Sequence, residues 1–177
     1  MSKSLIQKTT VGFAIIGFAA VISFRCLNPF APKLDRSIGS SDIVTEQTTP
    51  AEVMQNFKIA YTFRDSLLYS DLLDTAFVFV YFDPDAGTSG NYVSWGRDVD
   101  LSTTGKLFRH FTIIDLVWNT TLYEFDEGDR GELSKSFDLT LTGTDVDYHL
   151  SGRAVFSFRK CADSRWRITR WKDETDS

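Results

Sequence analysis

Strict alternation of apolar and polar residues in the last third of the chain constrains the fold more than any other feature of the sequence. From Val146 to Phe158, apolar or small residues occupy every second position, and charged, hydroxyl or histidine side chains occupy nearly all the positions between them. Side chains of a β-strand point alternately to opposite faces, so this pattern predicts a long strand with one buried face. Residues 137–142 show the same alternation and lead into the turn residues 143–145. Two antiparallel strands joined by a short turn are therefore expected.

A further strand is expected at the C-terminal end, after a turn over residues 160–165. Trp166 and Ile168 continue the alternation, but Trp171 falls out of phase by one position. Because a slip of one residue moves every later side chain to the other face, we predict a β-bulge near Arg170. The C-terminal half of the chain is thus predicted to form an antiparallel meander.

Two helices are predicted ahead of the sheet. Thr49 is suited to be the N-cap of the first, Pro50 to be its first residue, and Glu52 to reach back in a capping box. An apolar stripe follows at helical spacing, which indicates a helix packed against a core. Asp65 is expected to cap a second, short helix over residues 66–72.

The remaining elements are expected between these helices and the meander. Residues 76–82 are apolar at every position, which predicts a strand covered on both faces. Farther along, the sequence predicts a loop, a short helix with Ser102 or Thr103 as its cap, and another strand, over residues 83–91, 100–110 and 113–125 respectively.

The N-terminal segment has the composition of an export signal or of a short membrane anchor. Residues 1–10 are basic, and residues 11–24 are uncharged and almost wholly apolar. Fourteen helical residues would span roughly 21 Å, whereas the hydrocarbon core of a bilayer is roughly 30 Å thick. The length and the basic flank are more typical of a signal peptide than of a membrane span.

Cys26 follows this segment after one residue, Arg25, at the place where a bacterial lipoprotein signal carries the cysteine that is lipidated. The alternative is an ordinary cysteine at the end of an apolar segment.

Residues 27–48 contain prolines and small polar residues, and are expected to form a flexible tether. We therefore predict a signal peptide or anchor over 1–26, the tether, and a globular domain over 49–177. This domain is expected in the cell envelope, attached to a membrane and facing the periplasm or the exterior.

Charge and cysteine content exclude several classes of function. The 177 residues carry a formal charge of −5, and a surface of this sign repels phosphate backbones, so no nucleic-acid partner is expected. Two cysteines are too few for a disulfide framework.

The loop with Asp83 and Asp85 lacks the glycine spacing and the closing glutamate of a calcium loop. Neither a metal site nor a cofactor is expected.

The order of these elements, which ends in Trp166-Arg-Ile-Thr-Arg-Trp-Lys-Asp173, resembles the nuclear transport factor 2-like superfamily. The resemblance covers residues 50–173. It implies an α+β fold in which a cone-shaped, curved antiparallel sheet packs against N-terminal helices and encloses a pocket. It also implies a habit of forming homodimers. Members of the superfamily use the pocket for dehydration, isomerisation, hydrolysis or ligand binding, so the fold alone decides no function.

A narrower resemblance concerns the residues around the predicted lipidation site. The segment Cys26–Asp35, together with the first helix and with Trp95 and Arg97, resembles a group of uncharacterised bacterial lipoproteins of this fold. The resemblance implies an address in the envelope. It implies no activity.

Two classes of function remain. The first is a non-enzymatic domain that binds a small apolar ligand or a partner protein through an aromatic pocket, with the expected contact residues Trp95, Trp118, Trp171, Tyr61 and Tyr69. The second is a small lyase, isomerase or hydrolase, which needs a general base in the pocket. Asp115, which lies among apolar residues, and His110, at the end of a predicted helix, are the candidates for that base.

Overall fold

The computed structural model describes residues 43–174. These residues lie in the second of the two units, 1–35 and 36–177, into which the chain divides. Among them, no helix has the length and apolar character needed to cross a bilayer. The predicted signal segment and Cys26 lie outside the described residues.

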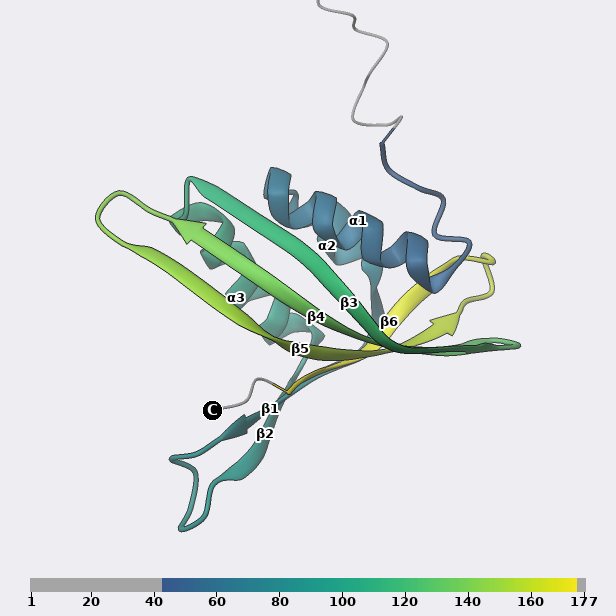
Figure 1. Ribbon diagram of the computed structural model, residues 1–177. Helices are drawn as coiled ribbons and strands as arrows, with labels where there is room; N and C mark the ends of the chain where they lie inside the picture. The colour runs from purple at the N-terminus through teal and green to yellow at the C-terminus, as the bar shows by residue number, and fades with distance from the viewer. Residues whose placement is uncertain (1–42, 175–177) are drawn as a thin grey trace, which may run out of the picture. The chain divides into compact units, whose positions relative to one another are not determined.

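The described domain combines a six-stranded sheet with three helices (Figure 1). The elements follow in the order α1 (Pro50–Phe63), α2 (Ser66–Leu72), β1 (Leu73–Asp83), β2 (Asn91–Gly96), α3 (Arg97–His110), β3 (Ile113–Glu127), β4 (Arg130–Thr142), β5 (Asp147–Lys160) and β6 (Trp166–Asp173). The strand order in the sheet is β2-β1-β6-β5-β4-β3. All neighbouring strands are antiparallel except β1 and β6. This is the curved α+β architecture that the family resemblance implied, with one parallel pair in a sheet that was expected to be antiparallel.

The start of α1 confirms the predicted cap and corrects one detail of it. The hydroxyl of Thr49 accepts a hydrogen bond from the backbone N–H of Glu52, at 3.2 Å. The Glu52 carboxylate reaches back to Thr48 rather than to Thr49, because Thr48 offers both its N–H and its hydroxyl, at 2.7 and 2.9 Å. Two donors on one residue are satisfied in place of the single donor of a capping box.

The break between α1 and α2 follows from two residues. Arg64 adopts the left-handed conformation, with φ at 55°, and its N–H bonds back to carbonyls of the last turn of α1. The carboxylate of Asp65 then accepts the N–H groups of Leu67 and Leu68, both at 3.0 Å. The predicted cap of the second helix is confirmed.

The C-terminal meander is also confirmed. Strands β4 and β5 pair without interruption, from Arg130 opposite Arg159 to Thr142 opposite Asp147. The register of β5 against β6 shifts between Ser157 and Phe158. This shift leaves Thr169 as the extra residue, so the predicted bulge lies next to Arg170.

Two predictions about the middle of the chain were wrong. Strand β1 is not covered on both faces: Val78 and Phe82 are exposed, because the strand runs out into a hairpin with β2 that extends away from the helices (Figure 1). Helix α3 begins at Arg97, earlier than expected, with Gly96 as an N-cap that makes no side-chain hydrogen bond. Ser102 and Thr103 therefore lie inside the helix and cap nothing.

The parallel pairing of β1 with β6 was not predicted. It places Leu73 opposite Ile168 and Phe79 opposite Trp171. The last strand of the chain consequently lies inside the sheet, between the first strand and the meander.

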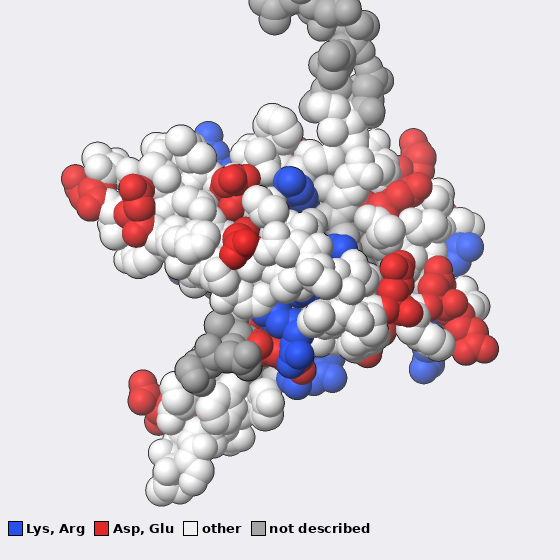
Figure 2. Space-filling model, in the orientation of Figure 1, with Lys and Arg blue, Asp and Glu red and all other residues white. Residues whose placement is uncertain are grey.

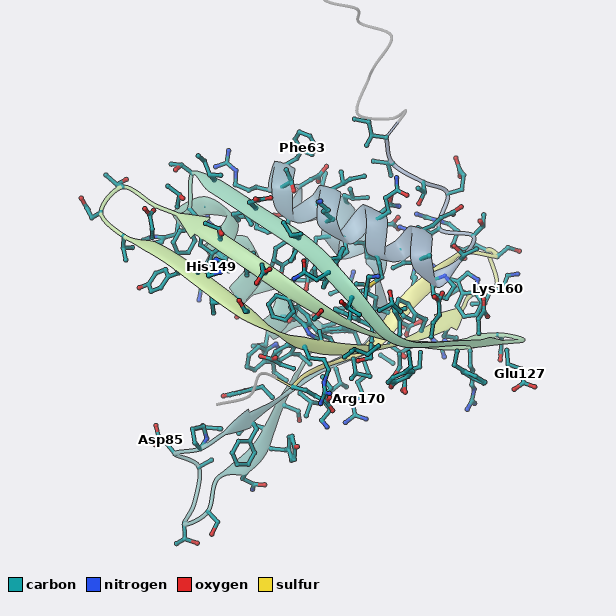
Figure 3. All side chains as sticks on the ribbon, viewed as in Figure 1. Phe63, Asp85, Glu127, His149, Lys160 and Arg170 are labelled. Carbon is teal, nitrogen blue, oxygen red and sulfur yellow. The ribbon has the colours of Figure 1, made fainter. Side chains whose placement is uncertain are left out.

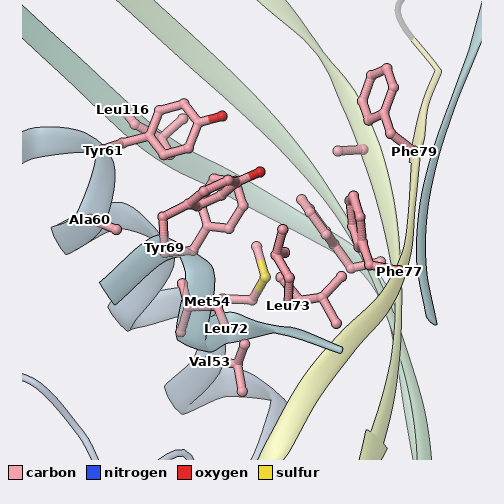
Figure 4. Packing of buried hydrophobic residues seen from close by; sticks show 14 of the residues in the cluster. Val53, Met54, Ala60, Tyr61, Tyr69, Leu72, Leu73, Phe77, Phe79 and Leu116 are labelled. Atoms are coloured by element: carbon pink, nitrogen blue, oxygen red, sulfur yellow. The ribbon is translucent and has the colours of Figure 1, made fainter. Parts of the chain in front are cut away.

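The helices cover one face of the sheet and enclose a core rich in aromatic rings (Figure 4). Phe57 of α1 lies at its centre, with ring centroids between 4.7 and 5.7 Å from those of Tyr61, Tyr69, Trp118, Phe156 and Trp171. Contacts of this kind add to the free energy of apolar burial.

The residues just before α1 are held against the domain. Asn56 is buried, and its side chain exchanges hydrogen bonds with the backbone of Thr45, at 2.8 and 3.0 Å. The carbonyl of Gln47 accepts the N–H of Trp166 at the start of β6, at 2.8 Å. Residues 45–48, the end of the expected tether, are thus in contact with the helix and the sheet.

On the face that Figure 2 shows, acidic and basic side chains are interspersed.

Candidate functional site

An apolar cavity of about 210 Å³ lies between the helices and the sheet. Helices α1 and α3 and strands β1, β3, β4, β5 and β6 supply its lining. The lining residues are Phe57, Tyr61, Phe79, Leu107, Leu116, Trp118, Phe137, Leu139, Leu150, Trp171 and Asp173. Most of these side chains are aromatic or leucine. The cavity can therefore hold an apolar molecule, and it offers that molecule few polar partners.

Two of the three tryptophans expected to contact a ligand line this cavity. The indole N–H of Trp118 donates to the carbonyl of Met54 at 3.2 Å, which fixes the ring between α1 and the sheet. Trp171 stacks on Phe156, at 5.5 Å between centroids, and meets Phe79 edge to face at 4.8 Å. Both rings are held by the core, so they form a rigid part of the wall.

Trp95 and Tyr69 are placed one layer behind the wall. Trp95 stacks on Phe79, at 4.5 Å between centroids, and Phe79 separates it from the cavity. Tyr69 is buried and packs against Tyr61, which does line the cavity. Of the five expected contact residues, the structure brings Tyr61, Trp118 and Trp171 together at the cavity and places the other two as their support.

Trp95 and Tyr69 meet at one buried carboxylate, Asp100 of α3. The Tyr69 hydroxyl donates to Oδ2 of Asp100 at 2.6 Å, and the indole N–H of Trp95 donates to Oδ1 at 3.0 Å. Asp100 is 3% exposed. Helices α2 and α3 and strand β2 are thereby joined by one side chain behind the aromatic wall.

Burial sets the protonation of this cluster. It raises the pKa of the Asp100 carboxyl, although the hydrogen bonds from Tyr69 and Trp95 oppose the rise. Burial also raises the pKa of Tyr61 and of Tyr69 well above the usual range for tyrosine, and the charge of Asp100 adds to both shifts. The two hydroxyls point in the same direction in Figure 4. They are neutral hydrogen-bond donors at physiological pH.

Neither candidate base from the sequence lies at the cavity. Asp115 is exposed, because its neighbours Ile114 and Leu116 take the buried face of β3 and the pleat turns Asp115 to the other face. His110 is the last residue of α3 and is exposed. The titratable groups that do line the cavity are Tyr61 and Asp173, the last residue of β6.

Neither Asp100 nor Asp173 was among the site residues expected from the sequence. A usable signal existed for Asp100: it shares one face of α3 with the buried Thr104 and Phe108, four and eight positions later. No local pattern distinguishes Asp173 from the exposed carboxylates. Its place follows from the pairing of β6 inside the sheet. Within residues 43–174, no group of three or more His, Cys, Asp or Glu side chains could hold a metal ion.

A curved sheet with three helices on one face and an apolar cavity between them defines an α+β protein of the nuclear transport factor 2-like fold. Solved structures agree with this. A nuclear transport factor 2-like superfamily protein from Salmonella enterica matches with a TM-score of 0.58 and 15% identity, over 78% of this chain and 94% of that one. A candidate dehydratase of the same family from Streptomyces avermitilis matches with a TM-score of 0.59 and 17% identity, over 78% and 98%.

A candidate scytalone dehydratase from Novosphingobium aromaticivorans also matches, with a TM-score of 0.59 and 15% identity, over 72% of this chain and 81% of that one. No family model matches the sequence, and the comparison with curated proteins gives no match. At these identities the likeness shows the fold and leaves the function to be argued from the cavity.

Proposed function

We propose that the domain binds a small, mostly apolar ligand of one or two aromatic rings in this cavity, without carrying out a reaction on it. The lining itself is the observation that carries the proposal: a wall of fixed aromatic rings and leucines with only two titratable side chains. An apolar cavity of about 150 Å³ is enough to hold benzene. The volume of about 210 Å³ supports a ligand somewhat larger than that.

Binding should depend on Leu150, which lines the cavity and is 46% exposed. We expect Leu150→Trp to weaken the binding of 2-naphthol by about tenfold, because the larger side chain occupies space at the cavity. Isothermal titration calorimetry on the full chain measures the dissociation constant. Leu122→Trp is the matched control: Leu122 is 50% exposed on β3 and does not line the cavity. Equal affinities in both variants would show that 2-naphthol binds elsewhere.

Asp173 gives a reason to keep an enzymatic alternative. A carboxylate beside an apolar cavity is the arrangement that a general base requires, and Tyr61 could donate to a developing oxyanion from the same wall. Such an enzyme would be a lyase, isomerase or hydrolase. A hydrolase would use the base to activate water, whereas a lyase or isomerase would differ from the binding proposal by exchanging a carbon-bound proton.

The exchange of the α-protons of 2-tetralone in D₂O, followed by NMR, tests this alternative without knowledge of a substrate. The binding proposal expects the same rate with wild type, with Asp173→Asn and in buffer. A lyase or isomerase that uses Asp173 would accelerate the exchange, lose the acceleration in Asp173→Asn, and keep it in Asp115→Asn, whose carboxylate lies on the exposed face. Acceleration with that pattern would replace the binding proposal.

We further propose that the domain works in the cell envelope, tethered to a membrane through the segment that ends at Cys26. The composition of residues 1–26 supports this. In a Gram-negative host, the intact mass of the product is expected to correspond to a chain that starts at Cys26 and carries about three acyl chains. The variant Cys26→Ser should lack them. An unmodified, uncleaved chain in both cases would instead indicate a short anchor.

A further inference from the structure

A second, polar cavity of about 450 Å³ lies away from the aromatic one. It is lined by α2, by the start of β1, by the first residue of α3 and by the β5–β6 end of the sheet, with the residues Leu67, Ser70, Asp71, Leu73, Asp74, Thr75, Arg97, Arg159, Cys161 and Arg167. Three arginines and two aspartates therefore share one cavity. It has no residue in common with the aromatic cavity.

Both aspartates are already paired. Asp74 is buried and accepts from Nη2 of Arg159 at 2.6 Å. Asp71 is paired with Arg165, which does not line the cavity. Arg167 is paired with Asp163, at 2.6 Å, and lies 3.9 Å from Asp71.

Arg97 is the arginine of this cavity that has no carboxylate partner: within residues 43–174 it forms no ion pair. It donates through Nη2 to the carbonyl and hydroxyl oxygens of Ser70, at 2.9 and 2.8 Å. Its Nε is buried and has no hydrogen-bond partner among the described residues. Of the five N–H donors of a guanidinium, the hydrogen bonds to Ser70 use only those of Nη2. An acceptor in the cavity would bind donors that Ser70 does not use.

The surroundings of Arg97 favour an anion as that acceptor. Arg97 is the first residue of α3, and the N-cap, Gly96, supplies no side-chain oxygen to this end of the helix. The hydroxyl-bearing residues Ser70 and Thr75 also line the cavity. A guanidinium recognises a phosphate or carboxylate with two parallel hydrogen bonds, which a single hydroxyl cannot match.

We propose that this cavity binds a phosphate group, with Arg97 as the main contact and with Arg159 and Arg167 contributing positive charge. The phosphate group belongs either to free inorganic phosphate or to a headgroup such as that of a lipid. The site is independent of the aromatic cavity, so the two can be occupied together.

Calorimetric titration of the full chain in a non-ionic detergent tests the site, with inorganic phosphate and glycerol 3-phosphate as probes at constant ionic strength. Arg97→Gln removes the charge and the fork of donors, and with them the hydrogen bonds of Nη2 to Ser70. It should weaken both affinities by about tenfold or more. Arg109→Gln is the matched control: it removes the same charge from the exposed end of the same helix, and should change the affinities by less than about twofold.

The two probes separate the two sources of the phosphate group. Equal affinities would identify phosphate itself as the ligand, and tighter binding of glycerol 3-phosphate would identify a headgroup. Binding that is equal in wild type and Arg97→Gln, or absent at tens of millimolar of either probe, would overturn the proposal. If Arg97→Gln does not fold, Arg97→Lys keeps the charge without the fork. The increase in melting temperature that phosphate gives to the wild type should then be reduced in that variant.

Discussion

Phe57→Ala is expected to lower the free energy of unfolding by about 3–5 kcal/mol. The side chain is 1% exposed, and its ring packs against five others in the core. Removing it eliminates these contacts and leaves a void that the neighbouring rings are too rigid to fill. Urea denaturation of the full chain, followed by far-UV circular dichroism, measures the change.

Phe63→Ala is the matched control. Phe63 lies on the same helix but is 64% exposed and points away from the sheet (Figure 3). We expect a change of less than about 0.5 kcal/mol. If both variants lose the same stability, the ring cluster around Phe57 does not act as the core of the domain.

The second large effect is expected at Asp100. Asp100→Ala leaves the buried Tyr69 hydroxyl and the Trp95 N–H without an acceptor, so we expect a loss of about 2–4 kcal/mol. Asp98→Ala, two positions earlier in the first turn of α3, is the control: Asp98 is exposed, and its loss should cost less than about 1 kcal/mol. In a double-mutant cycle with Tyr69→Phe, the two losses should couple by about 1–2 kcal/mol. Strict additivity would contradict the proposed network.

Comparing the pH dependence of the free energy of unfolding of the wild type with that of Asp100→Asn isolates the contribution of the Asp100 charge. The pKa of Asp100 is raised in the folded state, so the folded chain binds this proton more tightly than the unfolded chain does. Between the unfolded and the folded pKa, the carboxyl therefore adds stability as the pH falls. The free energy of unfolding of the wild type, relative to Asp100→Asn, should rise from pH 7 towards pH 4. The other carboxylates are common to both chains and cancel in the difference. A relative stability that falls over this range would show that Asp100 is stabilised in its charged form.

Features that depend on a few neighbouring residues could be predicted from the sequence. Thr49 and Asp65 cap helices because their side chains reach the first free N–H groups, whatever the rest of the chain does. The bulge beside Arg170 follows from the phase of the alternation. The same alternation of side chains along a strand was sufficient to place Asp115 on the face of β3 that Ile114 and Leu116 do not occupy, and hence away from the cavity.

Features that depend on distant pairing could not be predicted in this way. Asp173 reaches the cavity because β6 enters the sheet beside β1, and no pattern around either strand specifies that partner. The face of α3 indicated that Asp100 is buried, but not its two donors, which come from α2 and β2, separated from it by 31 and 5 positions. The groups that bind a buried carboxylate come from several elements, and these elements meet only in the folded domain.

The position of β6 inside the sheet has a consequence for synthesis. While the chain is being made, β1 has one edge available to β2, and its other edge stays open until the last strand leaves the ribosome. Open edges of this kind favour wrong pairing and aggregation, and contacts between the ends of a domain form slowly. The domain therefore completes its fold only after translation has reached Asp173. A nascent chain stopped before Trp166 would expose two unpaired strand edges, those of β1 and β5, to any chaperone that recognises them.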